Sequence, residues 1–305
     1  MRSLGAYEEV ERSVHWLRGR FKGRHPAVAL VLTSGIGGFT KGLEDPITFT
    51  YQEIPGFPRD HEDGRLWLGK VNGVEVMVMD GRYYFYDGYA PHECVHGVRV
   101  MGRLGAQALI IKNAAGSADP KVQPGSLVVV TGHLNLTGDS PLRGPHDERL
   151  GPQHVDMTKA YDSVLRDHIH DCAARLRADM VPAPTPEKPD AKVTTWPMPL
   201  HPGGVFAQVP GPEFETEHQV TAIREQGGTL IGMAMAFEVI AARQLDMRCA
   251  GIVQVTNMAA GVEGGRPTPT EIRTSLATAS PLTVRLLREV MGTPMPPQKV
   301  AVALD

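Results

Sequence analysis

Residues 27–39 read AVALVLTSGIGGF, an apolar run that ends in a hydroxyl group and several glycines. The apolar part is continuous rather than alternating, as expected of a strand that is covered on both faces. Glycines after such a strand let backbone N–H groups close on an anion, because a Cβ there would block the approach. The stretch therefore predicts a buried strand followed either by an anion-binding loop or by a plain tight turn.

Similar apolar runs recur along the chain and alternate with helical patterns. The strand-like runs lie at 73–80, 108–113, 126–131, 204–209, 229–234 and 251–257, and the helical patterns at 8–21, 158–176, 237–247 and 269–291. This alternation indicates an α/β protein with a largely parallel sheet. Asn72 and Gly73 lie between two apolar runs and predict a β-hairpin, so the sheet should be mixed. Asp156 is the predicted N-cap of the second helical segment, residues 158–176.

The composition is that of a globular protein. The chain has 305 residues, of which 42% are hydrophobic and 21% charged, enough for a large core. A proline-rich stretch at 181–203 interrupts the pattern, but strand material resumes directly after it. We therefore expect one domain over residues 1–305, with 181–203 as a surface excursion.

Several classes of function are disfavoured. The formal charge of -3 comes without a basic stripe, which argues against nucleic-acid binding. No apolar stretch approaches the length of a membrane helix and the N-terminus lacks the apolar centre of a signal peptide, so we expect a cytoplasmic protein that does not enter membranes. Cys94, Cys172 and Cys249 form no CxxC pair and the histidines form no HExxH motif, so neither a disulfide framework nor a metal site is expected.

Two nucleotide-binding motifs fit the glycine loop poorly. A dinucleotide fingerprint needs a third glycine where Thr40 stands, and it needs an acidic residue at the end of a second strand. A P-loop needs Gly-Lys-Ser/Thr at its end, and the sequence there is FTKG. The sequence therefore leaves open whether this loop binds a small anion or is a plain turn.

Other predicted strand ends also carry small or polar residues. The stretches are GRYYFYDGY (81–89), NAAG (113–116), GPEFET (211–216) and VTN (255–257). The guanidinium of Arg82, just beyond a strand end, suits a phosphate or a carboxylate. Tyr83 and Tyr89 are better explained as an aromatic cover of the core.

Taken in order, and with SPLRGPHDERLG (140–151) and GMAMAFEVIAAR (232–243), these stretches resemble the trimeric purine nucleoside phosphorylases, a family that includes the methylthioadenosine phosphorylases. The resemblance runs from about residue 27 to residue 290. It implies a single-domain α/β fold around a mixed, partly barrelled sheet flanked by helices, and a homotrimer with sites near the subunit interfaces. It also implies that a purine nucleoside reacts with phosphate to give the free base and a pentose 1-phosphate, with phosphate as co-substrate and no cofactor.

The resemblance also assigns roles to individual residues. Ser34, Arg82 and the backbone N–H of Ala114 would bind phosphate, with His61 as a further candidate. Tyr86 and Met233 would line the ribose, and Phe214 would stack near the base beside Thr256. Glu215 would accept a hydrogen bond from purine N1–H, and Asn257 would bind N7 and the 6-substituent. An asparagine there goes with 6-oxopurines in this family. A helix-start carboxylate is the structural alternative for Glu215.

The sequence departs from the family pattern at a few positions. Ala234 replaces a hydroxyl residue that contacts phosphate, and Glu62 stands where the family has a histidine, with His61 one position away. Tyr84 and Thr270 replace two further histidines. In the family, the histidine at the position of Thr270 meets the ribose 5′-OH. A 5′-modified nucleoside is therefore an alternative substrate. His154 stands where relatives carry an aromatic that reaches the neighbouring subunit's site, and it offers a polar contact in its place.

Two other functions compete with phosphorolysis. An altered phosphate site would give a nucleoside hydrolase or a glycosyl-transfer enzyme, in which water or another nucleophile reaches C1′. A protein that binds nucleosides or purines with poor catalysis is the remaining possibility.

Overall fold

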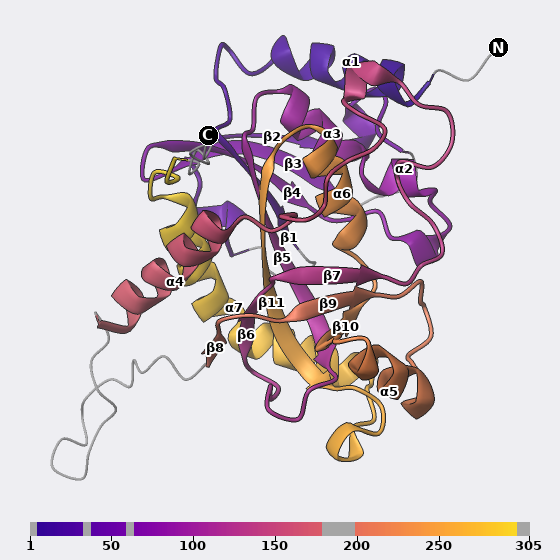
Figure 1. The fold of residues 1–305 in the computed structure, drawn as a ribbon. Helices are drawn as coiled ribbons and strands as arrows, with labels where there is room; N and C mark the ends of the chain where they lie inside the picture. Colours follow the sequence, from indigo (N-terminus) through magenta and orange to yellow (C-terminus); the bar gives the residue numbers. More distant parts are fainter. Residues whose placement is uncertain (1–4, 33–37, 59–63, 179–198, 298–305) are drawn as a thin grey trace, which may run out of the picture.

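The protein is described by a computed structural model that covers residues 5–32, 38–58, 64–178 and 199–297 (Figure 1). Its helices are α1 (Ala6–Arg18), α2 (Pro91–Cys94), α3 (His96–Arg103), α4 (Ser163–Ala178), α5 (Glu217–Glu225), α6 (Ala236–Gln244) and α7 (Pro269–Met291). Its strands are β1 (Val28–Leu32), β2 (Glu44–Thr50), β3 (Arg65–Val71), β4 (Val74–Asp80), β5 (Ala108–Ser117), β6 (Leu127–Val129), β7 (Gly132–Asn135), β8 (Leu200–His201), β9 (Val205–Gln208), β10 (Leu230–Gly232) and β11 (Arg248–Met258).

The strands form one mixed sheet that branches at β5. Strand β5 is parallel to β1 on one side and to β11 on the other, and its last residues pair antiparallel with β10. The path through the sheet runs β2-β3-β4-β1-β5-β10-β9-β7, while β11 leads on to β6 and β8. The predicted mixed sheet flanked by helices is thus confirmed.

The predicted hairpin is present between β3 and β4. Val71 pairs with Val74, which leaves a two-residue turn. Asn72 and Gly73 in this turn have φ values of 49° and 78°. Two consecutive positive φ angles match the turn type whose twist suits a hairpin, and Asn-Gly is its favoured sequence.

Helices cover both faces of the sheet. On β1, Ala29 and Val31 pack into a core with α1, α3 and α6, whereas Val28, Leu30 and Leu32 pack into a second core with α4 and α7. All five residues are buried, which explains why the sequence of this strand does not alternate. Figure 1 shows α1 at the top, α3 and α6 to the right of β2, β3 and β4, and α7 with α4 at the lower left. The buried parallel strands are therefore the middle layer of three.

Sequence and structure differ in some elements. Helix α4 begins at Ser163 rather than after Asp156, so that N-cap prediction is wrong. The Asp162 carboxylate accepts from the N–H of Leu165, which is the geometry of an N-cap, and Ala160 and Tyr161 are buried in the core before the helix begins. Strands β2, β7 and β8 and helices α2 and α3 had no prediction, and α5 was anticipated only in the helix-start alternative for Glu215.

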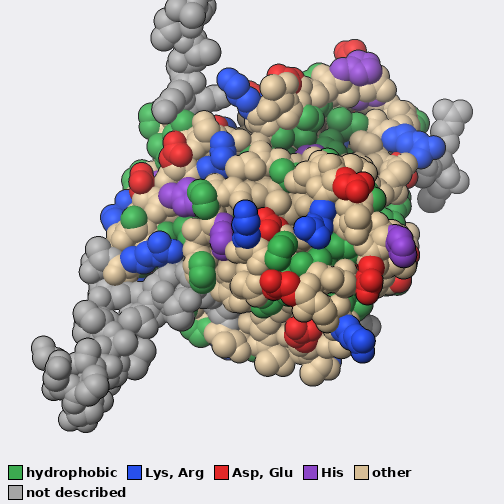
Figure 2. Space-filling model, turned by 60° about the horizontal axis from the view of Figure 1, so that its bottom comes forward, with side chains coloured by type: hydrophobic (Ala, Val, Ile, Leu, Met, Phe, Trp, Pro, Cys, Tyr) green, Lys and Arg blue, Asp and Glu red, His purple; other side chains and the backbone are tan. Residues whose placement is uncertain are grey.

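The surface shows little segregation of charge on the face that Figure 2 presents, where acidic and basic side chains are interspersed with neutral and apolar ones. Across the described ranges, the helices are too short or too polar to cross a membrane. Cys94, Cys172 and Cys249 are buried free thiols.

Candidate active site

The predicted site residues meet at the ends of β5, β10 and β11. A cavity of about 350 Å³ opens there, and Figure 1 shows these strand ends between α7 and α5. Its lining comprises Tyr84, Tyr86, Asn113, Ala114, Ala115, Gly116, Phe214, Glu215, Ile231, Gly232, Met233, Ala234, Thr256, Asn257, Ala259, Pro267, Pro269, Ile272, Arg273 and Leu276. Segments more than 180 residues apart in the chain thus form one site.

A β-bulge shapes the end of β11. Gln254 and Val255 pair with Ala114 and Ala115 of β5, but the next paired residue is Asn257, so Thr256 is the extra residue. A bulge re-aims side chains at the end of a strand. Both Thr256 and Asn257 are buried, and the Thr256 hydroxyl lies 2.8 Å from Asn257 Oδ1 while Asn257 Nδ2 donates to the Met258 carbonyl at 2.9 Å. The Asn257 amide is therefore held in one orientation.

Gly116 of β5 allows the Asn257 side chain to lie close to the strand. A Cβ at Gly116 would lie 3.0 Å from Asn257 Nδ2. That separation is shorter than ordinary van der Waals contact, so any larger residue would displace the amide. The close approach of the Asn257 side chain thus requires the glycine at the end of the NAAG stretch.

The segment between β10 and α6 brings Met233 and Ala234 to the cavity in an unusual conformation. Met235, which precedes α6, has a φ of 117°. A non-glycine residue with such a φ is strained and persists only where its surroundings hold it. Asn113 Nδ2 donates to the Ala234 carbonyl at 2.8 Å, and Gln208 Oε1 accepts from the N–H of Ala236 at 2.6 Å. Side chains from β5 and β9 therefore fix this segment.

Phe214 and Glu215 come from the segment before α5. Thr216 caps this helix, since its hydroxyl accepts from the N–H of Gln219 and Gln219 Oε1 accepts from the N–H of Thr216. Glu215 is thus not the capping residue, and its side chain lines the cavity instead. Burial raises the pKa of the Glu215 carboxyl, and the nearby Glu213 adds to this. Phe214 is 38% exposed at the cavity wall.

Arg82 lies behind the cavity in a buried polar cluster. Its Nη1 donates to Asn113 Oδ1 at 2.8 Å, its Nη2 donates to the Lys112 carbonyl at 3.0 Å, and its Nε lies 2.9 Å from Glu238 Oε1. Burial raises the pKa of the Glu238 carboxyl, although the charge of Arg82 opposes the shift. Burial and the charge of Arg82 lower the pKa of Lys112 to about 7.

The remaining walls come from the tyrosine segment and from α7. The rings of Tyr84 and Tyr86 stack with centroids 4.8 Å apart. Helix α7 contributes residues at positions i, i+3, i+4 and i+7, which share one face of a helix. These are Pro269, Ile272, Arg273 and Leu276.

The structure brings most of the predicted site residues together. Asn257, Thr256, Glu215, Phe214, Met233, Tyr86 and Ala114 line the cavity, together with Ala234 and Tyr84. Arg82 does not line the cavity, but it donates a hydrogen bond to Asn113, which does. Thr270 and the exposed His154 do not line it. Ser34, His61 and Glu62 lie outside the described residues.

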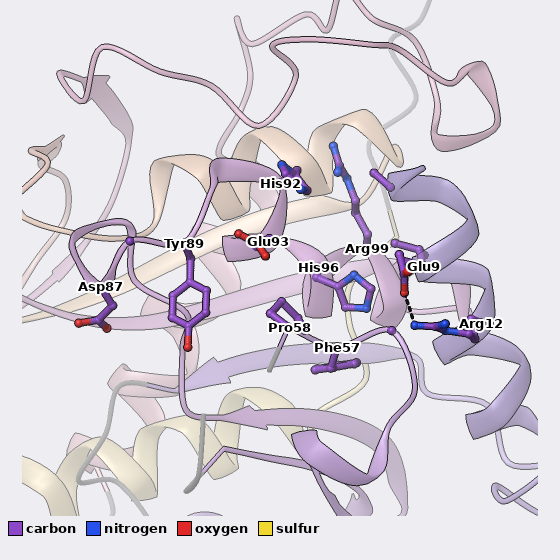
Figure 3. A pocket seen from close by; sticks show the side chains of 14 residues that line it. Glu9, Arg12, Phe57, Pro58, Asp87, Tyr89, His92, Glu93, His96 and Arg99 are labelled. Carbon is purple, nitrogen blue, oxygen red and sulfur yellow. Dashed lines mark hydrogen bonds and ion pairs between the residues drawn. The ribbon is translucent and has the colours of Figure 1, made fainter. Parts of the chain in front are cut away.

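A second cavity, of about 640 Å³, lies between α1 and the α2–α3 segment (Figure 3). It contains none of the predicted site residues. The buried His96 lines it, with its Nε2 2.9 Å from the Ser13 hydroxyl, and burial lowers the pKa of His96 to about 3. Glu9 and Arg12 form an ion pair at its edge. The cavity thus presents mixed charges without convergent groups for one ligand.

A family model described as "Phosphorylase superfamily" matches residues 29–291, which include every element of the cavity. The chain belongs to the Phosphorylase superfamily. Among curated members, the purine nucleoside phosphorylase 1 of Geobacillus stearothermophilus is 34% identical over 260 residues, which cover 83% of this chain and 85% of that protein. The purine nucleoside phosphorylase of Rattus norvegicus is 35% identical over 257 residues, with 82% of each chain covered.

Solved structures in the superfamily have the same fold. A Schistosoma purine nucleoside phosphorylase in complex with hypoxanthine matches with a TM-score of 0.83 and 27% identity, over 97% of this chain and 100% of that one. The Schistosoma mansoni enzyme in complex with adenosine matches equally well.

Sequence reasoning missed the charged residues Lys112 and Glu238. Lys112 interrupts the apolar run ALIIK and Glu238 stands in the apolar stretch AFEVIAA. Charged side chains are almost never fully buried unless they are paired. A single charge inside a continuous apolar run is the signal that could have pointed to this cluster.

Proposed function

We propose that the protein is a purine nucleoside phosphorylase, which cleaves the N-glycosidic bond of a purine ribonucleoside or deoxyribonucleoside with phosphate. The observation that carries this proposal is the convergence of Asn257, Glu215 and Phe214 with Met233 and Ala114 in one cavity. The names of the curated relatives agree with it. Phosphate is the co-substrate, and the reaction needs no cofactor.

The base side of the cavity suits a 6-oxopurine. Glu215 accepts a hydrogen bond from N1–H, and the Asn257 amide donates to N7 or the 6-oxygen. As the glycosidic bond breaks, its electron pair moves onto the purine, and negative charge builds up at N7 and O6. A donor that is already oriented toward this charge stabilises the transition state more than the ground state. The hydrogen bonds of Asn257 to its own strand supply that fixed orientation.

The opposite side of the cavity binds phosphate. The backbone N–H of Ala114 and the cluster of Arg82 and Asn113 supply donors at the end of β5, with Ser34 and His61 as further candidates. A phosphate oxygen attacks C1′ as the C1′–N9 bond breaks, so the products are the purine base and a pentose 1-phosphate. Tyr86 and Met233 bound the sugar between the two sides.

We further propose one domain over residues 1–305, a cytoplasmic location, and a homotrimer in which the site is completed at a subunit interface. Phe214 at the cavity wall and Leu136 are the exposed large hydrophobic residues of the described chain, at 38% and 36%. An aromatic side chain exposed beside a binding cavity is better covered by a partner than by water. His154 is the candidate for a contact with the neighbouring site.

The test is base release from inosine with and without phosphate. We expect hypoxanthine and ribose 1-phosphate in equal amounts, and no base when phosphate is omitted. Base release that does not depend on phosphate would instead favour a nucleoside hydrolase. Binding of purine without turnover of inosine, guanosine, adenosine or a 5′-deoxy-5′-substituted analogue would contradict an enzymatic role.

A further inference from the structure

The buried cluster behind the cavity joins three elements through one guanidinium group. Arg82 follows β4, Asn113 is on β5, and Glu238 is in the first turn of α6. The Nε, Nη1 and Nη2 atoms of Arg82 face Glu238 Oε1, Asn113 Oδ1 and the Lys112 carbonyl at 2.9, 2.8 and 3.0 Å. Because the guanidinium is planar and rigid, these two hydrogen bonds and one ion-pair contact determine both its position and its plane.

Glu238 is connected to the cavity by this chain of contacts. It does not line the cavity, and its side chain is 7% exposed. Asn113 does line the cavity, and its Oδ1 accepts from Arg82 while its Nδ2 donates to the Ala234 carbonyl. An unbroken path of polar contacts therefore runs from Glu238 through Arg82 and Asn113 to the loop that carries Met233.

The Glu238 carboxylate forms a buried ion pair with Arg82. An arginine buried this deeply keeps its charge, and a buried guanidinium that loses an oxygen partner moves toward water or another partner. The position of Glu238 on the rigid first turn of α6 opposes such movement. Gln208 holds that turn in place through its contact with the N–H of Ala236.

We propose that Glu238 is a positioning residue for phosphorolysis, which fixes the guanidinium of Arg82, and through it the Asn113 side chain, in the orientation that binds phosphate. This inference rests on the proposed function. We expect Glu238 to affect the binding of phosphate rather than the binding of the nucleoside. The contacts from Glu238 reach the cavity at Asn113, and Asn113 precedes Ala114 on β5.

The test compares two substitutions that separate geometry from charge. Glu238→Asp keeps the charge but withdraws the carboxylate by about 1.5 Å. The carboxylate would then lie too far from Arg82 Nε for a direct contact. Glu238→Gln keeps the length and an acceptor oxygen but removes the charge. We expect E238D to raise the KM for phosphate about tenfold or more, and E238Q to stay within about threefold of the unsubstituted enzyme. The KM for inosine should change less than twofold in both.

Gln244→Asn is the matched control. Gln244 is also buried on α6, and its side-chain oxygen also accepts from an arginine, Arg99. The substitution removes one methylene group, as Glu238→Asp does. Arg99, however, donates to the Pro141 carbonyl and does not line the active-site cavity. The phosphate KM of Q244N should be unchanged. If E238D does not fold, E238Q is compared with Glu238→Met, which has a similar length but no oxygen acceptor, and E238M should then show the higher phosphate KM.

Several outcomes would overturn the positioning role. One is a KM for phosphate that is unchanged in E238D, or that rises in E238Q as much as or more than in E238D. Another is a KM for phosphate that is equal in E238Q and E238M. A third is a parallel rise in the KM for phosphate and the KM for inosine. These outcomes concern Glu238 only if the unsubstituted protein releases base in a phosphate-dependent way. If it does not, the proposed function itself fails.

Discussion

Asn257 is the residue on which the proposed chemistry depends most. Its amide is buried, and contacts with Thr256 and the Met258 carbonyl hold it in one orientation. A fixed donor needs no reorganisation when charge develops on the leaving purine. Position 257 should therefore control the rate of bond cleavage more than the affinity for the nucleoside.

We expect Asn257→Ala to lower kcat for inosine by about 10²–10³-fold, because removal of one preorganised donor to a developing anion costs this much in other enzymes. The KM for inosine should change little. Steady-state kinetics at saturating phosphate would measure both values. A KM that rises while kcat is preserved would place Asn257 in ground-state binding only.

Glu215 should make activity depend on pH. Its carboxyl must be ionised to accept from N1–H, and burial raises its pKa. As the pH falls, the group takes up a proton at a higher pH than an ordinary glutamate does, so kcat/KM for inosine should fall on the acid side. The profile of Glu215→Gln should lack this acid limb. An identical limb in E215Q would assign the titration to another group.

At the scale of elements, the ends of β5 and β11 set the geometry of the site. The two strands run parallel over eight residue pairs, shift by one residue at Thr256, and then form two further pairs. This shift aims Asn257 at the cavity, and Gly116 leaves the space that its amide occupies. The geometry of this strand pair therefore belongs to the proposed catalytic site.

Gly116→Ala tests this arrangement. The new Cβ would lie 3.0 Å from Asn257 Nδ2 and would displace the amide by a few tenths of an ångström. We expect kcat/KM to fall about tenfold with a small change in Tm. Gly132→Ala on β7 is the control, since a Cβ there meets nothing within 4 Å. Equal kinetics in both variants would show that the approach of the strands does not position Asn257.

At the scale of the whole molecule, three layers bring strand ends together at one edge, and we propose that assembly of a homotrimer completes that edge. Sedimentation of the purified protein should give a mass about three times the 33.1 kDa of the chain. Phe214→Ser should weaken the assembly, because it removes an exposed apolar side chain from the proposed interface. A fully active monomer would contradict a site completed by a neighbouring subunit.

The sequence predicted much of the fold and of the site. Buried parallel strands appear as continuous apolar runs, and the Asn72-Gly73 turn is a local signal, so β1, β4 and the hairpin could be located without tertiary information. The residues at strand ends could be named for the same reason, because ligands collect where parallel strands end. Strand β2 was missed because its side chains are mostly exposed and it carries Pro46.

The sequence alone determined the kinds of residue that the site would contain, since the strand pattern and the motifs that carry the resemblance are local. Tertiary structure decided how these residues contact one another. It placed Arg82 behind Asn113 rather than at the cavity wall, paired it with Glu238 from a helix 156 residues further on, and set the bulge that aims Asn257. Such contacts depend on the packing of distant segments, and no spacing along the chain encodes them.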